Sequence, residues 1–537
     1  MLQWSFTASV GPDPRTATEI PPVSNRRNDE RDTRQRVVAD QVVLVRAIGA
    51  NALTVVAMSA RGLFGVLTAR LFGGPALGAF VLAATWVDLL AQVGVLGLDS
   101  GAMIRSAQAH SQHDLLAVRK IFRSALCITV AVSGVLGTGL VVLATTGWLE
   151  SLPGASGLQA FFVVLAVSLP AVAVGRVSAQ VARGLQVVHH DLYAQGALGT
   201  AVMIVALVAG YALGLGATSP AVAMTLGAIA GGGAAWQLTS RLIASSGDSA
   251  PPALSGASRG LVGFSLPIAA FHVVDVLAMR ADVLLLSMFA NRTAGVTALT
   301  LGIYCAVAEV AGVLRKFRQI FDLALTPVAA RARRDTEAGT RGHAGQVGRW
   351  LVAVIGPAVC VMILGGGAVL SLYGAGFEAG ASWLGVLAVA TGGHGIMVAL
   401  DSLLIVKKPA LNLLNGVVAV ALQAGVSVLL IPQHGPLGAA IAALVATAVR
   451  ALMLVVEVRI IEGWWWPVLS MGRPAIATAV ALLPGIVARL AWPGSTGASV
   501  AAAIFLVAYV GMWQWVGLAA DDRTLIKTIR ARLPQVP

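Results

Sequence analysis

The sequence predicts an all-α polytopic membrane protein with about fourteen transmembrane helices, and three observations lead to this fold class. Of the 537 residues, 57% are hydrophobic and only 11% are charged, and the mean hydropathy is +0.83. A soluble domain carries about 25% charged residues, so this composition excludes an ordinary soluble protein. The apolar residues form repeated runs of roughly 20, the length that crosses a bilayer as a helix. The basic residues gather in every second connection between these runs, as the positive-inside rule requires.

The apolar runs leave only short connections between them. The expected spans are 47–70, 76–103, 121–147, 159–181, 192–215, 219–240, 261–289, 294–314, 350–373, 381–405, 410–431, 437–458, 474–490 and 497–519.

Lysine and arginine decide the orientation of these helices. With a cytosolic N-terminus, the N-terminal tail and the start of the first span hold seven basic residues. The cytosolic connections and the C-terminal tail hold most of the others, among which we count Arg119, Arg241, Arg315, Arg450 and Arg459. A miscounted helix would scramble this alternation, so the pattern predicts both termini in the cytosol. The six basic residues outside these groups lie near external ends (Arg70, Arg292, Arg489) or within spans (Arg61, Arg176, Arg280).

A weak internal echo predicts that the first twelve spans form two lobes. Residues 71–78 close span 1 and open span 2, and residues 288–295 do the same for spans 7 and 8. The two stretches share one Phe and one Gly, and they lie six spans apart, so both copies run in the same direction. Parallel repeats are a common transporter plan in which the binding site lies between the lobes. We therefore expect two six-helix lobes around a central cavity, plus two extra C-terminal helices.

Polar segments mark the boundaries of this arrangement. The polar, Pro-containing N-terminus contains no secretory signal and is typical of a disordered tail. A Ser-, Gly- and Pro-rich segment separates span 6 from span 7. The expected regions are a cytosolic tail (1–45), an N-lobe (46–241), a cytosolic linker (242–260), a C-lobe (261–460), spans 13 and 14 (461–520), and a cytosolic C-terminal tail (521–537).

The connections and the cysteines exclude several classes of function. The external connections are short and hold only Glu150 and Glu378 as acids, so a membrane enzyme acting on lipid-linked sugars is not expected. No Gly-rich Walker loop is present to bind ATP. Cys127, Cys305 and Cys360 lie in apolar runs without the spacing of metal ligands or disulfides. We expect no cofactor and no metal. Despite a net charge of +13, we expect no nucleic acid partner, because the basic residues follow the membrane topology.

Four stretches carry a resemblance to a known family. They are LTARLFGGPALGAF (67–80), LYGAGFEAGASWLGVLA (372–388), IVKKPALNLLNGVVAV (405–420) and LLIPQHGPLGAAIAALVA (429–446). Each is mainly a turn with small residues, and their order and spacing resemble the oligosaccharide flippases of the multidrug/oligosaccharidyl-lipid/polysaccharide exporter superfamily.

The resemblance implies a V-shaped cavity between two lobes and alternating access. It implies that a lipid-linked oligosaccharide of the undecaprenyl-diphosphate type crosses from the cytosolic to the outer leaflet of a bacterial inner membrane, for cell-surface polysaccharide biosynthesis. The implied partners are the lipid-linked glycan, membrane lipids and other polysaccharide-assembly proteins. The alternatives are an ion-coupled multidrug or metabolite exporter of the same superfamily, and a scaffold without transport.

Arginines inside the spans are the expected ligands for an anionic diphosphate. A charged side chain within a bilayer costs at least about 2.5–3.5 kcal/mol, so it lines a polar path or pairs with an acid. The planar guanidinium fork suits phosphate. Arg61, in the outer half of the first span, is the first such ligand, with an ion pair as the alternative. The lipid II flippases resemble this helix at Ser59, Arg61 and Arg70. Snorkelling to the interface is the alternative for Arg70.

Span 7 carries the densest intramembrane charge, with His272, Asp275, Arg280 and Asp282. Asp275 and Asp282 are seven residues apart and share a helix face, whereas Arg280 points elsewhere. Arg280 is a second candidate for substrate binding, with an ion pair to Asp88 or another carboxylate as the alternative.

Several other residues are candidates for ion coupling or substrate contact. Asp88 and Glu309 are acids in apolar helices, and either they bind a proton or Na⁺ or they pair with arginines; Asp275 and Asp282 join them as ion-coupling candidates. The repeat places Glu309 opposite Gln92. Arg176 is a candidate for substrate contact on the cytosolic side; the alternative is that its side chain extends to the membrane interface. The run 315–318, which begins with Arg315, is interpreted as a basic surface for anionic headgroups or as a cytosolic gate.

Overall fold

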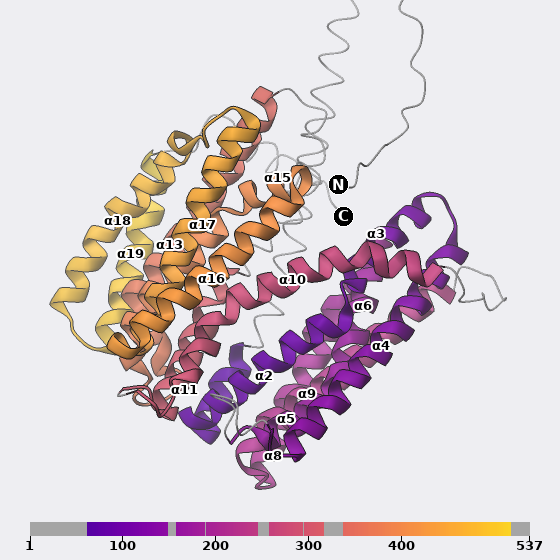
Figure 1. The fold of residues 1–537 in the computed structure, drawn as a ribbon. Helices are drawn as coiled ribbons and strands as arrows, with labels where there is room; N and C mark the ends of the chain where they lie inside the picture. Colours follow the sequence, from indigo (N-terminus) through magenta and orange to yellow (C-terminus); the bar gives the residue numbers. More distant parts are fainter. Residues whose placement is uncertain are drawn as a thin grey trace, which may run out of the picture. The chain divides into compact units, whose positions relative to one another are not determined.

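The computed structural model describes residues 62–148, 157–187, 189–244, 257–293, 295–315 and 337–516. These residues all belong to one compact unit, 48–517, and within them the chain is helical without a strand (Figure 1). Arg61, most of the predicted first span, both predicted tails (1–45 and 521–537) and most of the predicted linker 242–260 lie outside the described residues. The boundaries of the two lobes stay a prediction.

The first half of the chain forms a short helix, 62–72, and then a series of longer ones. The second helix begins at Gly74, with Pro75 in its first turn, after Gly73, whose φ of 85° few other residues tolerate. The elements are α2 (Gly74–Val95), α3 (Leu98–Ser111), α4 (Leu115–Thr145), α5 (Gln159–Ala166), α6 (Ser168–Gly184), α7 (His189–Asp191), the π-helix η2 (Leu192–Gly199), α8 (Thr200–Ala212), η3 (Gly216–Thr218) and α9 (Ser219–Ala244).

The second half contains the two longest helices, α10 and α13. Its elements are α10 (Ala257–Met288), α11 (Ala298–Ala311), α13 (Glu337–Ser371), η4 (Phe377–Gly380), α14 (Ala381–Ile396), α15 (Val398–Lys407), α16 (Pro409–His434), α17 (Pro436–Glu462), η5 (Val468–Met471), α18 (Gly472–Ala491) and α19 (Ser495–Val516). A capping box at Thr297 and Thr300 fixes the start of α11.

The predicted polytopic helical fold is confirmed. Among the described residues, eleven helices are long and apolar enough to cross a membrane, and α5 with α6, bent by 44°, makes a twelfth. Two of the fourteen expected spans, the first and the tenth, are not among these twelve. Span 1 is described only over 62–72, and span 10 is divided at Met397 into α14 and α15. The count is therefore compatible with about fourteen.

Two boundaries differ from the expectation. The predicted span 76–103 breaks after Val95, because Leu96 and Gly97 both have left-handed backbone conformations, with φ of 52° and 68°. The predicted connection 315–349 is helical from Glu337 onward, so α13 extends well before the apolar run at 350. In both cases polar or turn-forming residues lie at the ends of apolar runs, where hydropathy alone defines a helix end poorly.

The helices pack mainly with neighbours from their own half of the chain. In the first half, α6 contacts α3, α4 and α9, and in the second half α14 contacts α13 and α17, while α10 contacts α16. The pair α18 and α19 packs on α13. Helix α10 also contacts α2, α3 and α4, so it runs between the two sets of helices (Figure 1).

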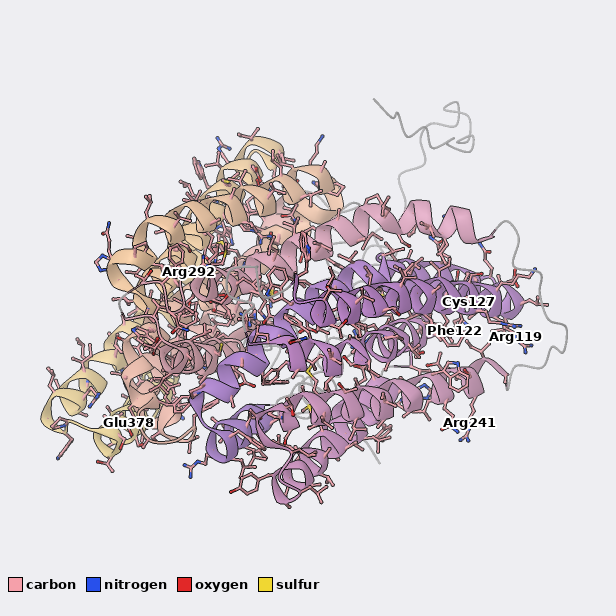
Figure 2. The ribbon with its side chains drawn as sticks, turned by 60° about the horizontal axis from the view of Figure 1, so that its bottom comes forward. Arg119, Phe122, Cys127, Arg241, Arg292 and Glu378 are labelled. Carbon is pink, nitrogen blue, oxygen red and sulfur yellow. The ribbon has the colours of Figure 1, made fainter. Side chains whose placement is uncertain are left out.

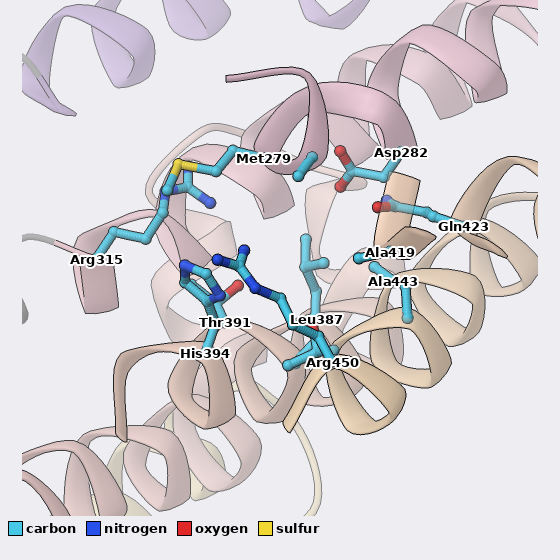
Figure 3. Close-up of a pocket in the computed structure, with 14 residues that line it drawn as sticks. Met279, Asp282, Arg315, Leu387, Thr391, His394, Ala419, Gln423, Ala443 and Arg450 are labelled. Atoms are coloured by element: carbon cyan, nitrogen blue, oxygen red, sulfur yellow. The ribbon is translucent and has the colours of Figure 1, made fainter. Parts of the chain in front are cut away.

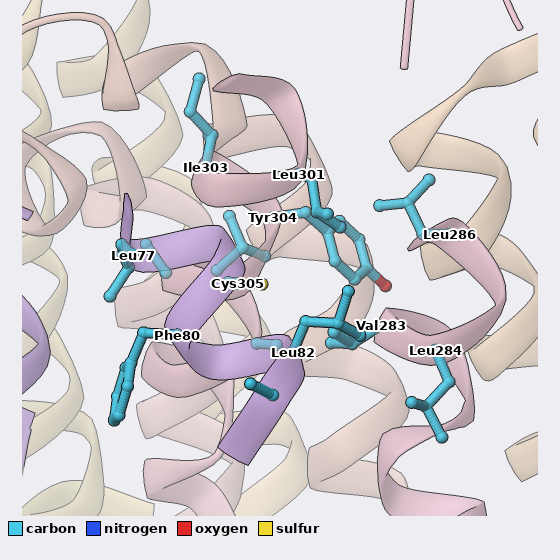
Figure 4. Packing of buried hydrophobic residues seen from close by; sticks show 14 of the residues in the cluster. Leu77, Phe80, Leu82, Val283, Leu284, Leu286, Leu301, Ile303, Tyr304 and Cys305 are labelled. Carbon is cyan, nitrogen blue, oxygen red and sulfur yellow. The ribbon is translucent and has the colours of Figure 1, made fainter. Parts of the chain in front are cut away.

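Backbones cross closely where α2 meets α11. A Cβ added at Gly302 would lie 2.0 Å from the carbonyl oxygen of Gly74, and one at Gly78 would lie 3.0 Å from the amide nitrogen of Gly302. Beside this crossing, Tyr304 of α11 is fully buried with Leu77 and Leu82 of α2 in one apolar cluster (Figure 4). Small residues at such crossings let membrane helices approach closely.

The charged ends of the helices agree with the expected alternation of connections. Figure 2 shows Arg119 and Arg241 toward one end of the helices, and Arg292 and Glu378 toward the opposite end. The positive-inside rule assigned the first two residues to one side of the membrane and the last two to the other. The chain is thus a multi-pass membrane protein, and these four residues lie at the two ends that the alternation predicts.

Candidate functional site

The described residues enclose a cavity of about 350 Å³ that we call the large cavity. Its walls come from the 62–72 helix, α2, α6, η2, α8 and α9 of the first half of the chain, and from α10 and α11 of the second half together with Arg315 just beyond α11. Most of the lining is apolar or glycine. The polar and charged lining residues are Thr85, Asp88, Arg176, Gln195, Arg280, Glu309 and Arg315.

Asp88 and Arg176 form an ion pair across the large cavity. The Nη2 atom of Arg176 lies 3.6 Å from Oδ1 of Asp88, and Nη1 donates a hydrogen bond to Oε1 of Gln92. The two charged side chains are 28% and 37% exposed, so both partners remain accessible from the cavity. Asp88 thus pairs with Arg176 and not with Arg280, for which a pair with Asp88 or another carboxylate was the alternative to substrate binding.

Two arginines line the large cavity without a partner among the residues that the structure describes. Within the described part of the chain, neither Arg280 nor Arg315 makes an ion pair or a side-chain hydrogen bond. An unpaired charge inside a membrane protein is costly and is retained where a ligand, an ion path or a water-filled space needs it. These two guanidinium groups therefore make the large cavity suited to an anion.

Glu309, which lines the large cavity, contacts the 62–72 helix and the residue Tyr373 that follows α13. Its Oε2 atom accepts a hydrogen bond of 3.3 Å from the hydroxyl of Tyr373, just after α13. The same carboxylate lies against the 62–72 helix, because a Cβ added at Gly65 would be 2.0 Å from Oε2. Glycine at 65 is what leaves room for the acid.

A smaller cavity of about 70 Å³ lies within the second half of the chain, and we call it the small cavity. Asp282 lines it, is only 4% exposed, and accepts a hydrogen bond of 3.0 Å at Oδ2 from Tyr304. Its Oδ1 atom is buried without a partner. Figure 3 shows Asp282 beside Gln423, with Arg315 on the opposite side of the small cavity.

Comparison with solved structures gives a consistent result. A lipid II flippase MurJ in an inward closed conformation is similar over 88% of this chain and 98% of its own, with 12% identity and a TM-score of 0.63. An inward-facing multidrug resistance MATE family transporter of the MOP superfamily is similar over 76% and 94%, with 15% identity and a TM-score of 0.62. A eukaryotic MATE transporter is similar over 81% and 100%, with 14% identity and a TM-score of 0.59.

The chain has the MOP fold. This confirms the fold expected from the resemblance to the multidrug/oligosaccharidyl-lipid/polysaccharide exporters, and each of these neighbours is a flippase or a transporter rather than an enzyme. No model of a protein family matches the sequence, and no curated protein matches it. Identities of this size establish the fold alone.

Some of the predicted site residues line one of the two cavities, and the others do not. Arg176, Arg280, Asp88 and Glu309 line the large cavity, and Asp282 lines the small one. Arg280 and Asp282, two residues apart on α10, line different cavities. Asp275 of α10 is half-buried and lines neither cavity, and Arg61 lies outside the described residues.

Arg70 lies away from both cavities, at the end of α13. Its Nε atom donates to the carbonyl oxygen of Leu372 at 2.7 Å, and Nη2 donates to that of Ser371 at 3.4 Å. The last carbonyls of a helix have no partner within the helix and carry partial negative charge, so a guanidinium stabilises them. Arg70 thereby joins the 62–72 helix to α13.

Sequence reasoning missed the partners of Arg450 and the double role of Arg315. Arg450, which we assigned to a cytosolic connection, lies within α17 and pairs with Asp401 at 3.2 Å, with side chains 6% and 2% exposed. Its position in the apolar run 437–458 was the signal that could have revealed it. Arg315 was interpreted as a surface or gate residue, yet it lines both cavities.

Proposed function

We propose that this protein flips a lipid-linked oligosaccharide of the undecaprenyl-diphosphate type across a bacterial inner membrane by alternating access. The single observation that carries the proposal is the pair of arginines, Arg280 and Arg315, that line the large cavity without a partner among the described residues. A diphosphate offers oxygens to both guanidinium groups, and arginine binds phosphate bidentately. Of the neighbours with this fold, MurJ is a lipid II flippase.

The physical need for such a protein lies in the substrate headgroup. A diphosphate and a glycan moved through hydrocarbon would lose their hydrogen bonds to water, which costs several kcal/mol for each polar group. A cavity lined by arginine, glutamine and threonine replaces some of these bonds, while the lipid tail stays in the bilayer. The cytosolic termini, the direction of transport and a role in polysaccharide assembly with partner proteins belong to the same proposal.

Ion coupling is part of the proposal at the acids that line the cavities. Asp88 is paired with Arg176, so a proton or a substrate phosphate that displaces one partner would free the other. Glu309 and Asp282 each accept a tyrosine hydrogen bond, and Asp275 lies on the same helix as Asp282. We propose Arg61, Arg70 and Arg176 as further substrate contacts during the transport cycle.

The alternative is an ion-coupled multidrug or metabolite exporter. Two of the compared structures are MATE transporters, and Asp88 and Glu309 place acids in the large cavity. A cationic drug would meet an excess of arginine there, however, since Arg176, Arg280 and Arg315 outnumber the two acids. The anionic substrate fits this lining better.

Gene deletion followed by complementation tests the proposed function. We expect a lipid-linked oligosaccharide to accumulate on the cytosolic side of the deleted strain, and wild-type protein to clear it. Arg280→Ala at equal membrane expression should clear it at least tenfold more slowly, because a charge-assisted contact of about 1.5–3 kcal/mol is lost. Arg292→Ala, in an exposed connection, is the control and should act as wild type. Full-rate clearance by Arg280→Ala, or drug sensitivity without glycan accumulation, would contradict the proposal.

A further inference from the structure

Arg315 occupies a position shared by the two cavities. It lines the large cavity together with Arg280 and Glu309, and it lines the small cavity together with Asp282. Its guanidinium lies over Gly312, one turn earlier, since a Cβ added there would be 2.7 Å from Nη2. A side chain at 312 would therefore crowd the guanidinium, and glycine leaves that space open.

The small cavity contains an acceptor that matches this donor. Oδ1 of Asp282 is buried and has no hydrogen-bond partner, while Oδ2 is held by Tyr304. Arg315 is itself without an ion pair or hydrogen bond among the described residues. A buried carboxylate oxygen and a nearby guanidinium that both lack partners are each costly alone, and pairing them removes much of that cost. They face each other across a space of only about 70 Å³ (Figure 3).

The other basic groups of the small cavity have partners, although Nε of Arg450 is buried without one. Arg450 is paired with Asp401 at 3.2 Å, and His394 makes an interaction of its own. Among the described residues that line the small cavity, Arg315 is the basic side chain that makes neither an ion pair nor a hydrogen bond, so it is available to Asp282. It is equally available to an anion in the large cavity, where Arg280 supplies a second unpartnered guanidinium.

We propose that Arg315 is a further substrate-binding residue that exchanges between two anions, the diphosphate of the substrate in the large cavity and Asp282 in the small cavity. The inference rests on the proposed function, since it requires an anionic substrate. When the diphosphate binds, Arg315 turns toward it and leaves Asp282. When the substrate departs, Arg315 returns to Asp282, so the occupancy of the large cavity is transmitted to the helices that surround the small one.

A double-mutant cycle on the full-length protein in detergent tests the exchange, with inorganic pyrophosphate as the probe and calorimetric titration as the measurement. Arg315→Ala should weaken pyrophosphate binding about 10- to 100-fold, as expected for lost charge-assisted hydrogen bonds. Asp282→Asn should strengthen binding severalfold, because it removes the competing anion. In the Arg315→Ala background, Asp282→Asn should change nothing. Arg292→Ala should bind as wild type.

A second variant keeps the test decisive if Arg315→Ala does not fold. Gly312→Ala retains the arginine but places a Cβ 2.7 Å from Nη2, so the guanidinium is displaced and binding should weaken. An elution volume in size-exclusion chromatography and a circular dichroism spectrum that both match those of the wild type confirm that each variant is folded.

The outcomes that overturn the exchange are distinct from those that overturn the proposed function. If Arg280→Ala weakens pyrophosphate binding but Arg315→Ala and Gly312→Ala do not, the exchange is wrong and the anionic substrate stands. If Asp282→Asn has the same effect in both backgrounds, Asp282 acts independently of Arg315 and the exchange is also wrong. If the wild-type protein binds no pyrophosphate, the anionic substrate itself is contradicted.

Discussion

Arginines within the helices of this protein differ in whether an acid lies beside them. Arg450 is compensated by Asp401 and buried with it, whereas Arg280 and Arg315 line a cavity without a partner in the described chain. A compensated pair contributes to the arrangement of α15 and α17, while an uncompensated guanidinium is available to a ligand. The same residue type therefore serves structure at one position and, in our proposal, binding at another.

Removing one partner of the buried pair should destabilise the protein strongly. Arg450→Met removes the guanidinium that lies 3.2 Å from the buried carboxylate of Asp401, and breaking a buried ion pair from one side costs about 3–5 kcal/mol. We expect a clearly lowered midpoint of thermal unfolding in detergent. Adding Asp401→Leu should restore most of the loss, because both charges are then gone. Lys407→Ala is the control: its partner Glu462 is buried, but the lysine itself is 32% exposed, so we expect a small effect of about 0–1 kcal/mol. Equal shifts for Arg450→Met and Lys407→Ala would refute this assignment.

At the residue scale, the sequence indicates which residues of one helix share a face, but it does not indicate their partners on other helices. Helical periodicity separated Arg280 from Asp282, and the structure places them on different cavities. Periodicity could not predict that Arg176 would pair with Asp88, because the two residues lie on different helices. The neighbouring hydrogen bond from Arg176 to Gln92 likewise joins residues 84 positions apart. Partners of this kind depend on how helices pack, which no local pattern encodes.

At the scale of elements, backbone contacts between helices replace side-chain contacts at one important crossing. Gly74 and Gly78 of α2 meet Gly302 of α11 so closely that a methyl group at 302 has no room. Near the same ends, Arg70 holds the last carbonyls of α13. These contacts join the 62–72 helix and α2 to helices from the second half of the chain.

Enlarging the residue at this crossing should separate the helices. In Gly302→Ala the added Cβ would lie 2.0 Å from the carbonyl oxygen of Gly74, so the backbones must move apart at a cost of about 1–3 kcal/mol. Gly367→Ala in α13 is a matched control, because nothing lies within 4 Å of its Cβ. That change should be neutral or stabilise by about 0.5–1 kcal/mol, since glycine disfavours a helix interior. The measurement is the midpoint of thermal unfolding of both variants under the same conditions. If the midpoint falls for both variants or for neither, Gly302 is not specifically required for the close approach of α2 and α11.

The sequence predicted the existence of the elements but not their interruptions. Runs of apolar residues placed the helices, since only a helix of such length satisfies its own backbone in lipid. The break at Leu96 was not predictable from hydropathy, because leucine rarely adopts a positive φ. Tertiary contact explains it: a Cβ at Gly97 would lie 2.4 Å from the carbonyl oxygen of Ser265, so α10 approaches the backbone at this break.

At the scale of the whole molecule, the distribution of lysine and arginine predicts the orientation in the membrane. Arg241 and Arg292 lie toward opposite ends of the helices (Figure 2). In a variant whose three cysteines are replaced by serine, Arg292→Cys should react with a membrane-impermeant maleimide in intact cells. Arg241→Cys should react only after the cells are opened. The reverse pattern would invert the predicted topology, and labelling of both in intact cells would contradict the span count.

The charge of the large cavity has an electrical consequence. Its lining carries three arginines and two acids, and these groups stay with the protein while the substrate crosses. If the cargo is a diphosphate, the net charge that traverses the bilayer is negative. A cell interior at negative voltage favours the exit of such a charge by about 2.3 kcal/mol per elementary charge per 100 mV. The resting potential of the cell would thus supply part of the driving force for export, and depolarised cells would lose that part.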